Sequence, residues 1–96
     1  MKKKDLLRVG NESRMISSNG HWMRVYHRGE RTCYLCNFCP TGSNGMLTKL
    51  ERLLDIEEVA MFQDVDMAFI VTNRKSGVPV YDLSEFLGSI GKEDKV

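Results

Sequence analysis

The chain has 96 residues, of which 42% are hydrophobic and 28% are charged, and its formal net charge is +1. This length corresponds to one small domain, and this composition is that of a globular protein rather than a disordered chain. No apolar run approaches the roughly 20 residues of a membrane-spanning helix, and the lysines at the start precede no sustained apolar segment of the kind found in signal peptides. We therefore expect a cytoplasmic protein without a membrane partner.

Charge is distributed unevenly along the chain. Residues 1–31 contain eight Lys/Arg and three Asp/Glu, a net charge of +5, whereas the remainder contains six and ten, a net charge of −4. We expect a flexible basic arm over 1–12, which includes Lys2–Lys4, then a single α+β domain over 13–91 and a disordered tail over 92–96. The asymmetry favours a basic working face on a protein that acidic residues keep soluble elsewhere.

Two tight-turn signals predict a three-stranded antiparallel meander over about 13–18, 21–28 and 31–38. Asn19-Gly20 suits a type I′ turn because both residues tolerate a positive φ, and Gly29-Glu30 suits a type II′ turn. The two-residue loops also set the register, which pairs Ser18 with His21, Ile16 with Met23, Tyr26 with Cys33, Arg24 with Leu35 and Arg28 with Arg31.

The rest of the chain predicts two helices and a second strand pair. Apolar spacing indicates a helix from about Met46 that bends or breaks near Asp55 and continues to Phe62. A buried strand follows over 67–72, then an edge strand over 78–81 and a short helix over 83–90. The predicted fold is α+β: a three-stranded antiparallel meander, then a helix, a β-hairpin and a short C-terminal helix, in the order β-β-β-α-β-β-α.

Strand alternation separates the meander side chains into two faces. One face is a predicted core face, and it consists of Ile16, Met23, Val25, Tyr34, Cys36 and Phe38. The other is aromatic and cationic, and its predicted binding residues are Trp22, Arg24, Tyr26, Arg28 and Arg31. Single-stranded nucleic acid needs flat apolar platforms for bases and cations for its backbone, so this face favours a nucleic-acid-binding module of regulatory, non-enzymatic character.

Two other interpretations of that face stay open. Trp, Tyr and Arg are also typical of protein–protein interfaces, so the chain would instead be an interaction module, an inhibitor of a larger complex or a homo-oligomer. Alternatively Met15, Trp22, Tyr26 and Leu35 form a second core face that a helix covers.

The cysteines suggest a further hypothesis. Cys33, Cys36 and Cys39 follow a Cys-x2-Cys-x2-Cys spacing, and Cys-x2-Cys is half of a typical zinc site. Cys36, Cys39 and His21 are the predicted ligands of one zinc ion, with Cys33 as a further candidate that the strand register places on the opposite face. The alternative is three buried free thiols.

A thiol–disulfide function is the enzymatic alternative. Cys36-Asn37-Phe38-Cys39 and the downstream Val78-Pro79-Val80 are similar to the active-site Cys-x-x-Cys and Val-Pro strand of glutaredoxins. The resemblance is confined to these residues, because a loop separates the second thiol from the next helix and the chain opens with a meander. The sequence holds no other complete catalytic signature, so we expect a protein that is not an enzyme.

Overall fold

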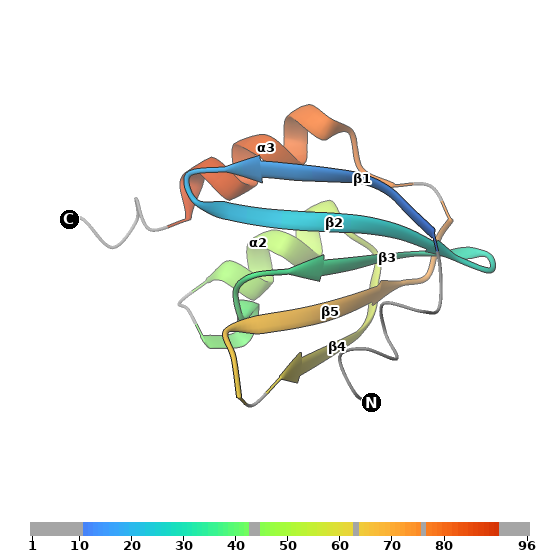
Figure 1. Ribbon diagram of the computed structural model, residues 1–96, viewed down its shortest axis with the longest axis horizontal. Coiled ribbons are helices and arrows are strands. Elements are labelled where there is room, and N and C mark those ends of the chain that lie inside the picture. Colours follow the sequence, from blue (N-terminus) through green and yellow to red (C-terminus); the bar gives the residue numbers. More distant parts are fainter. Residues whose placement is uncertain (1–10, 43–44, 63, 76, 91–96) are drawn as a thin grey trace.

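The computed structural model describes residues 11–42, 45–62, 64–75 and 77–90. In chain order its elements are β1 (Asn11–Ser18), β2 (His21–Arg28), β3 (Arg31–Cys36), the 3-10 helix η1 (Pro40–Gly42), α2 (Met46–Leu53), β4 (Ile56–Phe62), β5 (Met67–Thr72) and α3 (Val80–Ser89). The strands form one antiparallel sheet in the order β1-β2-β3-β5-β4 (Figure 1). The α+β class and the order β-β-β-α-β-β-α are confirmed.

The expected basic arm and tail fall largely outside the described residues. Of the arm over 1–12, the structure describes the backbone of Asn11 and Glu12, which begin β1. The tail over 92–96 is outside the described ranges. None of the helices within those ranges has the length and apolar character needed to cross a membrane.

The meander forms in the predicted register. Asn19 and Gly20 have φ values of 55° and 80°, as a type I′ turn requires, and Gly29 has a φ of 61°. Since Glu30 does not share this positive φ, the second turn matches the predicted type II′. The observed pairs are Ser18–His21, Ile16–Met23, Tyr26–Cys33, Arg24–Leu35 and Arg28–Arg31.

The segment predicted as a second stretch of helix, up to Phe62, is instead strand β4, so that prediction is wrong. Its register against β5 shifts between Ile56 and Glu58, which marks an irregularity of the β-bulge type. One extra residue lets Ile56 and Val59 both pack against the same core. The helix prediction rests instead on the spacing of Met61 from the apolar residues of 46–54, but in the structure Met61 lies on β4 and is 49% exposed, so it does not continue the buried side of α2.

The edge strand predicted over 78–81 is also absent, because helix α3 already begins at Val80. Pro79 caps this helix with φ −54° and ψ 144°, and its carbonyl accepts the Leu83 N–H at 3.3 Å. Proline suits this position because the first helical N–H groups lack intrahelical partners anyway. Strand β5 therefore pairs with β4 on one side and with β3 on the other, rather than with residues 78–81.

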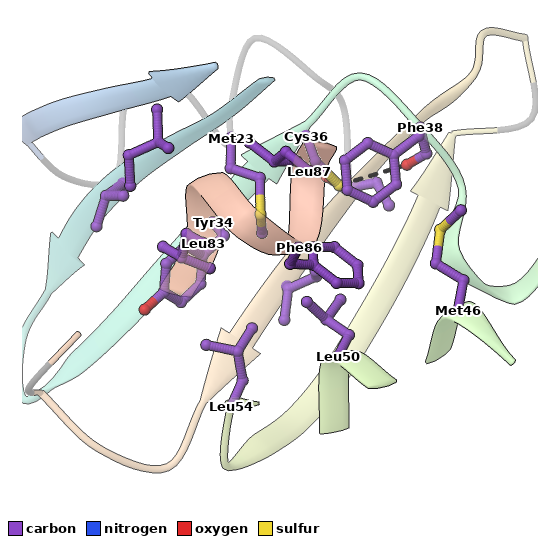
Figure 2. Close-up of a cluster of buried hydrophobic side chains, with 14 residues drawn as sticks. Met23, Tyr34, Cys36, Phe38, Met46, Leu50, Leu54, Leu83, Phe86 and Leu87 are labelled. Carbon is purple, nitrogen blue, oxygen red and sulfur yellow. Dashed lines mark hydrogen bonds between the residues drawn. The ribbon is translucent and has the colours of Figure 1, made fainter. Parts of the chain in front are cut away.

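One face of the sheet packs against both helices. The buried side chains between this face and the helices form a cluster that we call the first cluster (Figure 2). It includes all six predicted core-face residues. The helix side contributes Leu50 and Leu54 from the α2 region and Leu83, Phe86 and Leu87 from α3. Helix α2 lies behind the strands in Figure 1. The core face predicted for the meander is confirmed.

The opposite face holds a second cluster. Its buried members are Tyr26, Cys33, Leu35 and Phe69, and Trp22, Phe62, Met67 and Val71 pack against them while partly exposed. All eight side chains come from strands, and neither helix contributes to this cluster within the described residues. The aromatic-basic face is therefore the face away from the helices.

Candidate functional site

Strand β2 places four of the five predicted binding residues on the helix-free face. Alternation directs Trp22, Arg24, Tyr26 and Arg28 to this face, over a length of roughly 20 Å. Arg31 pairs with Arg28 across the tight turn and completes the set. The structure thus brings the five residues onto one face, although it buries them to different depths.

Trp22 and Arg24 form the accessible aromatic-basic element of this face. The Trp22 backbone N–H donates to Asn37 Oδ1 at 2.8 Å, and the Asn37 side-chain amide donates to the Gly20 carbonyl at 3.1 Å. The guanidinium of Arg24 lies 5.3 Å from the centre of the Trp22 ring, which is a cation–π distance. Both residues are partly exposed, so the pair offers an ordered ring and an adjacent cation at the surface.

Tyr26 is not accessible in the way predicted for a stacking platform. Its exposed fraction is 5%, and it packs in the second cluster with Leu35 and Phe69. Tyr26 and Leu35 are therefore core residues, as the alternative interpretation of this face as a second core face expects. That interpretation also expects a covering helix, and neither described helix lies on this face. Met15, opposite Arg24 on β1, is 53% exposed and extends the apolar character of the accessible part.

Arg28 and Arg31 lie at the turn end of the same face. Arg31 forms an ion pair with Glu57 of β4, and the two side chains are 51% and 35% exposed. An ion pair with this much solvent contact contributes little to stability and can exchange for another anion. Burial raises the pKa of the Cys33 thiol, and the positive charges of Arg28 and Arg31 nearby partly offset that rise.

Two further cations, Arg74 and Lys75, lie near this end of the sheet, and sequence reasoning missed them. The Thr32 N–H donates to the Arg74 carbonyl at 2.7 Å, and the Thr32 hydroxyl donates to the Lys75 carbonyl. Both side chains are exposed, although Arg74 also approaches Asp55 at 3.5 Å. Arg74 and Lys75 follow β5 and reach this end of the sheet because β5 pairs with β3. The sequence instead predicted a hairpin between β5 and residues 78–81, so their position beside Arg31 was not expected.

The thiols of Cys33 and Cys36 are buried on opposite faces of β3. The Cys36 thiol lies 3.3 Å from the Phe38 carbonyl and 3.4 Å from the Ala68 carbonyl, both of which can accept its proton. Burial raises the pKa of Cys36 to about 12, so this thiol is protonated at neutral pH. A protonated, buried thiol is a weak metal ligand and a weak nucleophile.

Cys39 and His21 border a separate hollow. Cys39 is half-buried and approaches the Met67 carbonyl at 3.5 Å, while His21 packs edge-on against Phe38 with ring centres 5.8 Å apart. They line a cavity of about 320 Å³ together with Asp66. Among the described residues, no three His, Cys, Asp or Glu side chains come close enough to hold a metal ion. The four predicted zinc ligands are therefore not gathered at one point.

The features that are similar to glutaredoxins are not reproduced in three dimensions. Residues 78–79 belong to no strand and lead directly into α3, so a Val-Pro strand is absent there. The Cys36 thiol is held in the core instead of at a helix N-terminus, where a low thiol pKa would arise.

Comparison of the chain with protein-family models, curated proteins and solved structures found no match.

Proposed function

We propose that this chain is a non-enzymatic binding module that contacts single-stranded nucleic acid through Trp22, Arg24, Arg28 and Arg31. The observation that supports this most is the Trp22–Arg24 stack on the same helix-free face as two further arginines. In this proposal Trp22 stacks on a base, and the arginines bind phosphates or stack on neighbouring bases.

The exposed part of the face suits a short, weak site. Of the two aromatic rings that the sequence suggested as platforms, Trp22 is accessible and Tyr26 is buried, and Trp22 supplies base stacking of about 1–3 kcal/mol. Arg74 and Lys75 at the turn end, with Lys2–Lys4 from outside the described residues, add long-range attraction for an anionic strand. The odd, closely spaced thiols fit a reducing compartment, so we place this activity in the cytoplasm.

Fluorescence of Trp22, the single tryptophan of the chain, provides the test. We expect a single-stranded oligonucleotide of about 12 nucleotides, within the range of known single-strand sites, to quench this fluorescence saturably. The same sequence as a duplex should bind more weakly, because its bases are not free to stack. Absence of quenching by any single strand would contradict the proposal.

Charge variants give the matched comparison. Arg28→Gln should weaken binding, whereas Arg52→Gln, an exposed arginine of α2 on the helix side, should leave it nearly unchanged. Equal weakening by both would indicate a diffuse charge effect instead of a site on the helix-free face.

A protein partner at the same surface is the second candidate, and Met15 favours it. This side chain is 53% exposed beside Arg24, and methionine and arginine are enriched in protein interfaces. A host complex that this module inhibits, or a second copy of the chain, would bind with little dependence on salt. Nucleic-acid binding would weaken steeply as salt rises.

A further inference from the structure

Two of the thiols, Cys36 and Cys39, lie close together at the end of β3. The chain bends at residues 37 and 38, between the two cysteines. The Cys36 thiol donates to the Phe38 carbonyl at 3.3 Å (Figure 2), and covalent geometry places that oxygen about 2.8 Å from the Cα atom of Cys39. The Cys36 sulfur is therefore at most about 6 Å from that Cα atom, so a small local shift brings the two sulfurs to bonding distance.

Both thiols also contact the same stretch of β5. Cys36 Sγ lies 3.4 Å from the Ala68 carbonyl oxygen, and Cys39 Sγ lies 3.5 Å from the Met67 carbonyl oxygen. Burial is the main cause that raises the pKa of Cys36, and the nearby Cys39 thiol raises it further, so the two thiols interact. Cys33 lies on the opposite face of β3 and is not part of this pair.

The two thiols differ in their access to small molecules. Cys39 is half-buried and borders the cavity of about 320 Å³, whereas Cys36 is 0% exposed. A small oxidant therefore reaches Cys39 first. Disulfides that form in a reducing compartment are usually transient, and many of them sense oxidants.

We propose that Cys36 and Cys39 form a reversible disulfide when a hydroperoxide oxidises the protein, and that this bond alters the surface around Trp22. In the first step the Cys39 sulfur attacks hydrogen peroxide, which gives a sulfenic acid on Cys39 and one water. The Cys36 sulfur then displaces the sulfenic hydroxyl, which leaves with the Cys36 proton as a second water. Each thiol loses its hydrogen, and the peroxide accepts the two electrons. Because the second step joins neighbouring groups of one chain, it does not need a strongly nucleophilic Cys36 thiol.

Asn37 connects this pair to Trp22. Its side-chain oxygen accepts the Trp22 N–H at 2.8 Å, its side-chain amide donates to the Gly20 carbonyl at 3.1 Å, and its backbone N–H donates to the Trp22 carbonyl at 3.3 Å. The disulfide removes the Cys36 proton that the Phe38 carbonyl accepts, and with it a hydrogen bond that holds the bend. The bend then moves Asn37 and the backbone of Trp22. Weaker binding of a single strand follows from this shift, and that consequence rests on the proposed function.

Oxidation of the full-length chain by hydrogen peroxide tests the bond itself. Remaining thiols are alkylated in denaturant and counted by intact mass. Of the three cysteines, we expect one to be alkylated in the oxidised natural chain, and all three after reduction with dithiothreitol. Cys33→Ser should still form the disulfide, whereas Cys39→Ser should keep both of its thiols. Three free thiols after oxidation, added oxygen without a disulfide, or a disulfide between two chains would overturn the proposal.

The emission spectrum of Trp22, the single tryptophan, reports the surface without any nucleic acid. We expect oxidation to shift the emission maximum in the natural chain and in Cys33→Ser, and dithiothreitol to reverse the shift. Cys39→Ser should show no shift. Unchanged emission from a chain with the disulfide fully formed would overturn the connection to Trp22. The oxidised natural chain should also bind a single strand about 5-fold or more weakly, as expected when the stacking of one base is disturbed.

Failure of this inference and failure of the proposed function give different results. If the reduced chain binds no oligonucleotide while oxidation still forms the disulfide and shifts the emission, nucleic-acid binding is contradicted and the redox switch is supported. If the reduced chain binds and peroxide leaves the thiols free, the switch is overturned and nucleic-acid binding stands.

Discussion

At the scale of single residues, access to solvent separates chemically similar side chains on β2. Trp22 and Tyr26 are both aromatic, lie on the same face and are four positions apart, yet Trp22 is partly exposed and Tyr26 is buried. The three thiols differ in the same way, because Cys36 is held in the core by two carbonyls while Cys39 borders a cavity. Residue type alone does not predict these roles.

The removal of Trp22 should reduce nucleic-acid affinity more than it reduces stability. We expect Trp22→Ala to weaken oligonucleotide binding about 5- to 150-fold, which corresponds to one stacked base of about 1–3 kcal/mol. Anisotropy of a labelled oligonucleotide measures this loss. Tyr81→Ala, at an aromatic residue that is 74% exposed on α3, is the control and should not change the affinity. If Trp22→Ala binds as tightly as the natural chain, Trp22 is not the platform.

Cys36 should make the protein less stable in alkali. Its pKa is about 12 in the folded chain against an ordinary value of 9.0, so between these pH values the unfolded chain loses a proton that the folded chain retains. The free energy of unfolding should therefore fall from about pH 9 upward, with a contribution approaching about 1.4 kcal/mol per pH unit. Urea denaturation at several pH values measures this slope.

Cys36→Ser keeps a side chain of similar shape that does not titrate in this range, so its slope should be shallower. Other groups also titrate in alkali, and the comparison between the two chains removes their contribution. An identical slope in both chains would show that Cys36 is not protonated preferentially in the folded state.

At the scale of elements, local chemistry decides the turns of the meander and long-range packing decides the rest. The two-residue turns place strands β1 to β3 in register without help from distant residues. Strand β4 depends on a register irregularity and on its partner β5, while α3 starts at a proline that resembles an edge-strand signal. Sequence patterns correctly predicted the register of β1 to β3, but they failed for the strand β4 and for the start of α3.

The second turn gives a prediction at this scale. Gly29 has a φ of 61°, and a Cβ added there would meet nothing within 4 Å, so any cost of substitution comes from the backbone. We expect Gly29→Ala to lower the free energy of unfolding by about 1 kcal/mol. Gly29→Asn should cost less, because asparagine tolerates this conformation better. Thermal or urea denaturation of the two variants checks the difference, and equal losses would argue against a conformational cause.

At the scale of the whole molecule, one face of the sheet packs against both helices, and the other carries the second cluster with cations at its exposed margin. Both helices pack on the first cluster, which leaves Arg24, Arg28 and Arg31 on the other side. Arg74 and Lys75 join the turn end through β5. This grouping of positive side chains depends on how distant parts of the chain meet.

Salt dependence measures this arrangement directly. If three arginines contact phosphates of a single strand, the logarithm of the association constant should fall with the logarithm of salt concentration with a slope of roughly −2. Arg28→Gln should make the slope less steep by about 0.7. Titrations at several salt concentrations give both values. A slope near zero would favour the protein-partner alternative.

The sequence by itself determined the three-stranded meander, its register and the identity of its two faces. These features follow from turn residues and from the two-residue period of strands, which are properties of neighbouring positions. Only the tertiary structure decided that β3 pairs with β5, that residues 56–62 form a strand, and that Tyr26 is buried while Trp22 is not. Those outcomes depend on contacts between segments far apart in the chain. The free energy of such contacts comes from burial that no local pattern specifies.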